Sequence, residues 1–138
     1  MCAHVAARDL MRRYIDLARA GDWEGAFRFV ADDAVIHIPG RSPHAGEVRG
    51  RDAVRRYIEA ARALSEGHDV EVELIDMLVS EERVALIVRE RFHRSGGDVE
   101  IRRANVYRIE HEHIVEVWIF EHDQYAVDEL MGELRLDE

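Results

Sequence analysis

Residues 84–120 read VALIVRERFHRSGGDVEIRRANVYRIEHEHIVEVWIF, and this stretch decides the fold. Segments 84–93, 99–109 and 114–120 are rich in β-branched and aromatic residues, and polar turns such as Ser95-Gly96-Gly97-Asp98 separate them. A fourth segment of this kind, residues 70–79, precedes them. Connections this short make neighbouring strands antiparallel. Strands of about ten residues are typical of a strongly curved sheet.

The part of the chain before these strands predicts helices. Apolar residues recur at helical spacing over residues 4–20, and Gly21 ends that helix. Asp22 is placed to cap a second, short helix over residues 23–30. A third helix over residues 51–64 ends before Gly67. Helices followed by an antiparallel run predict an α+β fold in which the helices pack on one face of the sheet and leave a conical cavity.

Shorter segments complete the expected organisation. Residues 34–38 predict a strand, and residues 39–46 contain both prolines and several turn formers, which indicates a loop at a rim or lid. Residues 124–131 predict either a short helix, with Asp123 as its N-cap, or a stretch that trails over the fold. The 138 residues have the size of one domain, so we expect a single domain over residues 1–138 with a core at about 8–125.

Composition excludes several classes of protein. The formal net charge of −10 and the lack of a basic stripe disfavour nucleic acid and anionic membranes as partners. Cys2 is the single cysteine, so the chain cannot form an internal disulfide or a thiolate metal cluster. No apolar run has signal-peptide or membrane-spanning length, so we expect a cytoplasmic protein. All 19 basic residues are arginine, which hints at a GC-rich bacterial source.

The order of several short motifs along the chain is more informative than any single motif. They are YIDLARAGDW from Tyr14, FVADDAVIHIPG from Phe29, GRDAV from Gly50, VYRI from Val106 and IVEVW from Ile114. In this order they resemble the ketosteroid isomerase and SnoaL-like branch of the nuclear transport factor 2-like superfamily, over roughly residues 8–125. The resemblance implies a cone-shaped, cystatin-like α+β fold with three N-terminal helices on a curved mixed or antiparallel sheet. It also implies an apolar pocket that works without metal or organic cofactor, often in a homodimer.

The resemblance implies specific roles and specific losses. Tyr14 matches the tyrosine that donates to the substrate oxyanion in ketosteroid isomerases. Asn105 stands where those enzymes hold a protonated aspartate, and an amide can still donate a hydrogen bond. Ile38 replaces their general base, and Ile119 replaces the aspartate of SnoaL-type cyclases. An aliphatic side chain cannot move a proton, so steroid isomerisation by the familiar mechanism is not expected. Glu112 replaces a common turn glycine, which suggests a different turn type.

Alternation along the strands gives the remaining candidate site residues. Asn105 shares a strand face with Ile101, Arg103 and Tyr107, and Glu121 continues the face of Val117 and Ile119. We therefore expect a substrate pocket lined by Ile38, Arg103, Tyr107, Val117 and Ile119, with Tyr14, Asn105, His37 and Glu121 as candidate catalytic residues.

Several of these residues also have a structural, non-catalytic interpretation. His37 neighbours Ile38, so alternation puts it on the opposite face, where a structural histidine is expected. Glu121 either acts as a base or only hydrates the rim. Trp118 and Phe120 on the other face fit a core or a homodimer interface. His111, His113 and His122 can be read as metal ligands, but solvated turn residues fit better because no third strong ligand has a defined spacing.

Three functional hypotheses follow. The first is a cofactor-independent isomerase or cyclase that acts on an apolar small molecule such as a polyketide, by shape and by polarisation of a carbonyl. The second, within enzymes, is an epoxide hydrolase of the same fold, for which Arg89 or Arg103 with Glu121 supplies part of the required set. The third is a binding or dimerisation module that transforms nothing.

Overall fold

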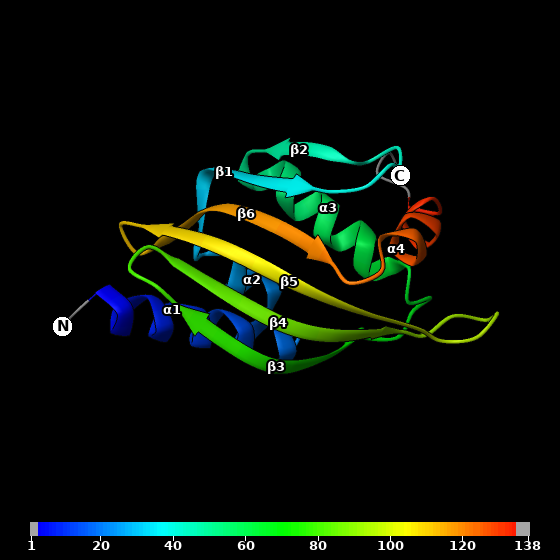
Figure 1. The fold of residues 1–138 in the computed structure, drawn as a ribbon, viewed down its shortest axis with the longest axis horizontal. Helices are drawn as coiled ribbons and strands as arrows, with labels where there is room; N and C mark the ends of the chain where they lie inside the picture. The colour runs from blue at the N-terminus through cyan, green and yellow to red at the C-terminus, as the bar shows by residue number, and fades with distance from the viewer. Residues whose placement is uncertain (1–2, 135–138) are drawn as a thin grey trace.

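The fold is a curved sheet covered on one face by helices. The computed structural model describes residues 3–134, so Cys2 lies outside the described residues. Six strands form one sheet in the order β2-β1-β6-β5-β4-β3. The sheet lies in front of the helices in Figure 1, with β2 and β3 at its two edges. The elements are α1 (Ala3–Arg19), α2 (Trp23–Phe27), β1 (Val30–Ile38), β2 (Gly46–Arg49), α3 (Arg51–Ala63), β3 (Glu71–Val79), β4 (Arg83–Phe92), β5 (Val99–Glu110), β6 (His113–Glu121) and α4 (Gln124–Met131).

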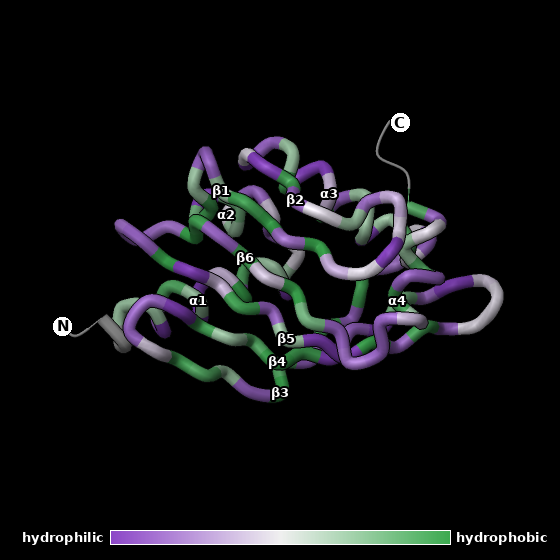
Figure 2. Tube along the Cα trace, turned by 45° about the horizontal axis from the view of Figure 1, so that its top comes forward, coloured by the Kyte–Doolittle hydropathy of each residue, from purple (hydrophilic) through white to green (hydrophobic). Residues whose placement is uncertain are grey.

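The long antiparallel strands are where the sequence predicts them. β3, β4, β5 and β6 pair in sequence order, and the register joins Leu86 to Asn105 and Asn105 to Ile119. The predicted α+β fold is confirmed, and the N-terminal helical prediction differs from α1 by one residue at each end. The second helix is shorter than predicted: α2 ends at Phe27, and Val30, the last residue of the predicted helix, begins β1. In Figure 2 hydrophobic segments run through the middle of the strands, and hydrophilic segments occupy the turns at their ends.

The β1 region departs from a simple antiparallel run. β1 begins at Val30, four residues before the predicted strand, and pairs with β6 in parallel, with Ile36 opposite Val117. On its other edge β1 pairs antiparallel with β2, a strand the sequence did not predict. β2 has four residues, and three of them are exposed. A strand this short lacks the alternation of apolar and polar residues by which strands are recognised.

N-cap residues begin α2 and α4, and a glycine ends α1, as predicted. Gly21 follows α1 with φ +82°, and the Asp22 carboxylate accepts a hydrogen bond from the Gly25 amide at 2.9 Å. Asp123 caps α4 in the same way through the Ala126 amide at 3.2 Å, so residues 124–131 form a helix. Each such cap stabilises its helix by about 1 kcal/mol.

The loop over residues 39–45 packs against α4. Gly40 has φ +96°, and a Cβ atom there would lie 2.1 Å from Asp128 Oδ1, so this close approach requires glycine. The Arg41 amide donates to the same carboxylate at 3.2 Å, and His44 Nε2 lies 3.0 Å from the Leu134 carbonyl oxygen. These contacts hold the loop on the C-terminal helix.

The core fills the space between the inner sheet face and the helices. Met11 of α1, Leu86 of β4 and Ile114 of β6 are at most 1 % exposed. Burying a side chain of this size stabilises the fold by roughly 1.5–3 kcal/mol. The packing leaves one part of this interior open, next to α1, α2 and α3.

Candidate functional site

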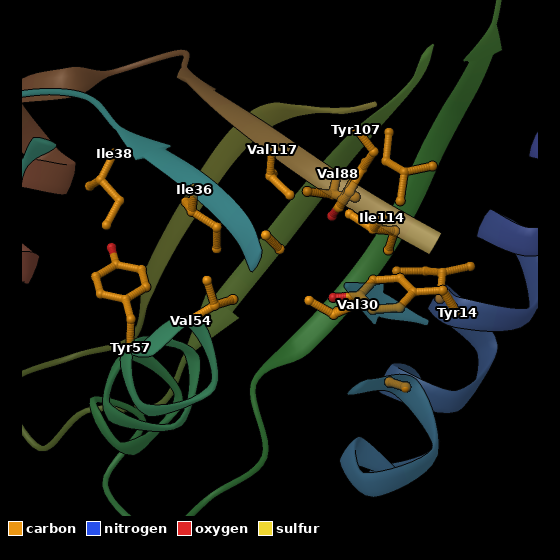
Figure 3. Close-up of a cluster of buried hydrophobic side chains, with 14 of the residues drawn as sticks. Tyr14, Val30, Ile36, Ile38, Val54, Tyr57, Val88, Tyr107, Ile114 and Val117 are labelled. Atoms are coloured by element: carbon orange, nitrogen blue, oxygen red, sulfur yellow. The ribbon is translucent and has the colours of Figure 1, made fainter. Parts of the chain in front are cut away.

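A cavity of about 210 Å³ lies between the inner face of the sheet and the first three helices. Most of its wall is apolar, because the inward positions of the strands carry aliphatic residues. Figure 3 shows Tyr14 near Val30 and Ile114 at one end of this cluster, and Tyr57 near Ile38 at the other. The strand residues that form the apolar wall are Val30, Ala34, Ile36, Val72, Leu86, Val88, Phe92, Ile114, Val117 and Ile119.

The cavity opens near the C-terminal end of α1. Among its lining residues, Arg19, Gly21 and Asp69 are exposed, and they mark this opening. Trp23 and Arg62 line the wall next to it, with the Arg62 guanidinium 4.7 Å from the centre of the Trp23 ring. Trp23 Nε1 is buried and has no hydrogen-bond partner within residues 3–134. Arginine and indole groups therefore surround the entrance of an otherwise apolar cavity.

Two tyrosines and an asparagine form a polar cluster in the cavity wall. The rings of Tyr14 on α1 and Tyr107 on β5 lie 5.9 Å apart at 60°. Asn105 is two residues before Tyr107 on the same inward face, and its side chain lowers the pKa of the Tyr107 hydroxyl. Asn105 Oδ1 is buried without a hydrogen-bond partner in the described part of the chain. An unpaired buried acceptor is costly, which is typical of a site that supplies its partner by binding.

Burial keeps these tyrosines protonated. Burial, and to a smaller extent the charge of Glu90, raises the pKa of Tyr14 to about 12. Burial also raises the pKa of Tyr107 well above its ordinary value, and its hydrogen bond with Asn105 opposes that rise. Both hydroxyls are hydrogen-bond donors at neutral pH. A donor with a high pKa in an apolar wall can stabilise charge that develops on a carbonyl oxygen.

A row of charged residues crosses the sheet beside this cluster. Arg103 on β5 binds both carboxylate oxygens of Glu121 on β6, at 3.1 and 2.7 Å. Its third nitrogen, Nη1, lies 3.6 Å from Glu90 Oε1 on β4. Burial lowers the pKa of Arg103, but the charges of Glu90 and Glu121 outweigh it and leave the pKa raised. Arg103 and Glu90 line the cavity, and all three side chains are at least 84 % buried.

Most of the residues that the sequence proposed for the pocket lie in it. Tyr14 and Asn105 line the same cavity, together with Arg103, Tyr107, Val117 and Ile119. Ile38 is 7 % exposed, and Figure 3 shows it beside the Tyr57 hydroxyl, but it is not part of the cavity lining. Tyr57 instead occupies that end and donates to Met131 Sδ at 3.8 Å.

His37 and Glu121, the two candidates for proton transfer, lie outside the cavity lining. His37 is on the outer sheet face, stacked on Trp118 with ring centres 5.4 Å apart, and Nε2 lies 2.5 Å from Glu116. This agrees with the alternation argument for a structural histidine. The carboxylate of Glu121 is 2 % exposed and is bound on both oxygens by Arg103, so it is buried behind the cavity lining and does not lie at a hydrated rim.

Glu90 is a charged lining residue on the inner sheet face that the sequence analysis did not predict. The signal was present: Leu86, Val88 and Phe92 alternate with outward residues on β4, and Glu90 occupies the inward position between Val88 and Phe92. A carboxylate in that register faces the helices and not the solvent. The bases of the enzymes that the chain resembles match positions on other strands, Ile38 on β1 and Ile119 on β6.

The described residues contain neither a cluster of metal-binding side chains nor a membrane-spanning helix. Within residues 3–134, no group of three or more His, Cys, Asp or Glu side chains is placed to hold a metal ion. His113 Nδ1 lies 2.9 Å from the carbonyl oxygen of His111 in the β5–β6 turn. No helix in this part of the chain is long and apolar enough to cross a membrane.

The fold and its cavity define a class of protein, the α+β cone of the nuclear transport factor 2-like superfamily. Within this class, residues 11–117 match the model of the SnoaL-like domain. The chain belongs to this family, which includes isomerases and cyclases as well as many proteins of unknown function. A search of curated proteins finds no match.

Solved structures support the same fold. A protein of unknown function with a cystatin-like fold from Xanthomonas campestris is 25 % identical, with a TM-score of 0.82 over 96 % of this chain and 100 % of its own. Bal32a, from a soil-derived mobile gene cassette, is 24 % identical, with a TM-score of 0.85 over 93 % of this chain and 98 % of its own. TerC, co-crystallised with polyporic acid, is 12 % identical, with a TM-score of 0.76 over 93 % of this chain and 99 % of its own.

Proposed function

We propose that this protein is an enzyme that polarises a carbonyl group of an apolar small molecule, such as a polyketide, for isomerisation or cyclisation. The observation that carries the proposal is the cluster of Tyr14, Tyr107 and Asn105 in the wall of an apolar cavity. The cavity binds the apolar body of the substrate by removing it from water. The tyrosine hydroxyls then donate to the carbonyl oxygen, and this interaction strengthens as negative charge develops there.

Size and polarity limit the substrate. A cavity of about 210 Å³ has room for a compact fused-ring compound rather than an extended chain. Inside the cavity the neutral donors Tyr14 and Tyr107 suit a carbonyl oxygen. Arg19 and Arg62 near the opening can bind a polar or acidic group at one end of the substrate. Holding the reacting groups of such a substrate in one orientation itself lowers the barrier to ring closure.

The test uses two simple probes. The first is 2-naphthol, an aromatic analogue of an enol, whose binding is followed by its fluorescence. The second is the ketone 2-tetralone, whose α-hydrogen exchange in D2O is followed by NMR. We expect Tyr14→Phe to slow protein-catalysed exchange by about 100-fold, the usual cost of losing one oxyanion donor. Tyr125→Phe is the matched control, because Tyr125 is 89 % exposed. Wild-type protein that neither binds 2-naphthol nor exchanges 2-tetralone would contradict the proposal.

A second candidate function is the addition of water to an epoxide, which the position of Arg103 between Glu90 and Glu121 favours. A carboxylate can orient and deprotonate a water molecule, while a hydroxyl donates to the opening ring oxygen. Incubation with styrene oxide in H2(18)O tests it, because an enzymatic diol carries one labelled oxygen and forms faster than in a protein-free control. A rate equal to that control rules this function out for styrene oxide and leaves carbonyl chemistry as the stronger reading.

A further inference from the structure

Glu90 differs from the other charged residues in how it is held. It stands on the inward face of β4 between Val88 and Phe92, with a side chain 16 % exposed, and it lines the cavity. Arg103 uses Nε and Nη2 on Glu121, so its contact with Glu90 is a single ion pair at 3.6 Å. That distance is longer than a hydrogen bond. The Glu90 carboxylate is therefore held by charge and not by a hydrogen bond from Arg103.

Glu90 and the tyrosine donors share one space. The charge of Glu90 raises the pKa of Tyr14 and of Tyr107, in each case as a smaller effect than burial. It also adds to the raised pKa of Tyr57 at the other end of the cavity. Glu90 and these three tyrosines all line the same cavity. A ketone that occupies the cavity is therefore enclosed by both the tyrosine donors and this carboxylate.

We propose that Glu90 is the general base of the site and that the substrate class is an apolar ketone with an acidic hydrogen on the carbon next to its carbonyl group. This inference rests on the proposed carbonyl chemistry and adds to it the group that moves the proton. It also explains how a cone that lacks the two familiar bases, with isoleucine at 38 and 119, can still transfer protons.

The step balances without a co-reactant. A carboxylate oxygen of Glu90 takes the α-proton, and the electron pair of the broken C–H bond forms a C=C bond as the carbonyl π electrons move onto oxygen. Tyr14 and Tyr107 stabilise that enolate oxygen through their O–H donors. In a substrate whose enolate is conjugated with a further C=C bond, the protonated Glu90 then returns the proton to the far carbon of that system, and the double bond shifts to give an isomer. Alternatively, the enolate carbon attacks a second carbonyl group, and the resulting alkoxide takes the proton from Glu90, which closes a ring.

The experiment compares deuterium uptake by 2-tetralone in wild-type protein and in four variants. Glu90→Gln keeps the shape of the side chain and removes the base, so exchange should slow by about 100-fold or more. Its affinity for 2-naphthol should change by less than about threefold, because that ligand is retained by the apolar wall. Glu90→Ala should be equally slow and should recover as formate is added, since a small carboxylate can occupy the vacated space. Recovery of this kind is not expected of a structural residue.

Two further variants are controls. Glu100 is an arginine-paired glutamate on β5 that lies outside the cavity lining, and Glu100→Gln should exchange within about twofold of wild type. Glu121→Gln weakens the anchor of Arg103 and should reduce exchange less than Glu90→Gln does. Its effect should not be reversed by formate.

Each outcome bears on one of the two proposals. Wild-type exchange in Glu90→Gln would overturn the role of Glu90 and leave the proposed function standing. Binding of 2-naphthol by wild type, without catalysed exchange of 2-tetralone, would also overturn the role of Glu90. Absence of both binding and exchange would overturn the proposed function together with this inference. If Glu90→Gln fails to fold, as judged by circular dichroism, the formate dependence of Glu90→Ala decides the question.

Discussion

Arg103 on β5 forms a two-pronged salt bridge with Glu121, its direct neighbour on β6, with Nε–Oε1 and Nη2–Oε2 distances of 3.1 and 2.7 Å. Both side chains are at least 89 % buried. Burial raises the pKa of Glu121, and the charge and hydrogen bonds of Arg103 only partly oppose this, so the net pKa is raised. For Glu121 the attraction of Arg103 does not fully offset desolvation, whereas for Arg103 the two carboxylates outweigh it, so the pair is not a clear source of stability. A pair of this kind is better explained by the position it gives Arg103 than by stability.

Removing one partner should still destabilise the fold, because it leaves a buried charge poorly compensated. We expect Glu121→Ala to lower the free energy of unfolding by about 2–3 kcal/mol, below the largest values for such pairs because Glu90 remains near Arg103. Urea denaturation at neutral pH measures it. Glu100→Ala, which breaks an exposed arginine pair, should cost less than about 1 kcal/mol. Equal small losses in both variants would show that the Arg103–Glu121 pair is not buried in solution.

Tyr14 should make the stability of the protein fall in alkaline solution. Its pKa is about 12 in the folded protein and 10.0 in an unfolded chain, so the folded state holds the proton more tightly. Its contribution to stability is complete below pH 10 and is lost as the pH rises towards 12. By pH 11 this loss is on the order of 1 kcal/mol.

The Tyr14→Phe variant isolates this effect. Urea denaturation at pH 8, 9, 10 and 11 should show a smaller decline in the variant than in wild type. Tyr125→Phe, which removes an 89 % exposed hydroxyl, should decline as wild type does. Parallel curves for wild type and Tyr14→Phe would mean that the Tyr14 hydroxyl is reached by water in the folded protein.

Filling the cavity should abolish binding without harm to the fold. Ala61 on α3 is half-buried and lines the cavity, so Ala61→Phe would project a ring into it. Since the ring enters open space, the cost in stability should stay below about 1 kcal/mol, less than overpacking a filled core. Affinity for 2-naphthol should fall by about tenfold or more, as fluorescence titration would show, because ligand and ring compete for one volume. Ala63→Phe, at an exposed position on the same helix, is the control. Unchanged binding in Ala61→Phe would place the ligand elsewhere.

The sequence predicts the long elements of this fold because their patterns are local. Alternation over 84–93 and 99–109 and the caps at Asp22 and Asp123 each depend on residues close together in the chain. The parallel pairing of β1 with β6 joins residues about 80 positions apart, such as Ile36 and Val117, and no local pattern records it. β2 escaped prediction because a four-residue, mostly exposed edge strand has no periodicity to detect.

The candidate site could be predicted where it depends on strand alternation. Strand alternation predicts four inward residues that do line the cavity: Asn105, Tyr107, Val117 and Ile119. Glu121 was also assigned to the inward face, but its role depends on the register that sets it opposite Arg103, and sequence alone does not supply that register. The sequence therefore predicts Arg103 and Glu121 as site residues, but the ion pairs that join Arg103 to Glu121 and to Glu90 depend on the tertiary structure.

Substitutions in the β5–β6 turn should raise the stability of the protein, because two non-glycine residues there have left-handed backbone conformations. His111 has φ +51° and Glu112 has φ +63°, as both central residues of a type I′ hairpin turn require. Such a conformation costs a side-chain-bearing residue roughly 1 kcal/mol or more relative to glycine or asparagine. We expect His111→Asn combined with Glu112→Gly to raise the free energy of unfolding by about 1 kcal/mol, measured by urea denaturation. Glu110→Gly, at the neighbouring strand position, should instead lower it by about 1 kcal/mol. A loss in both variants would mean that the turn is not left-handed at these residues.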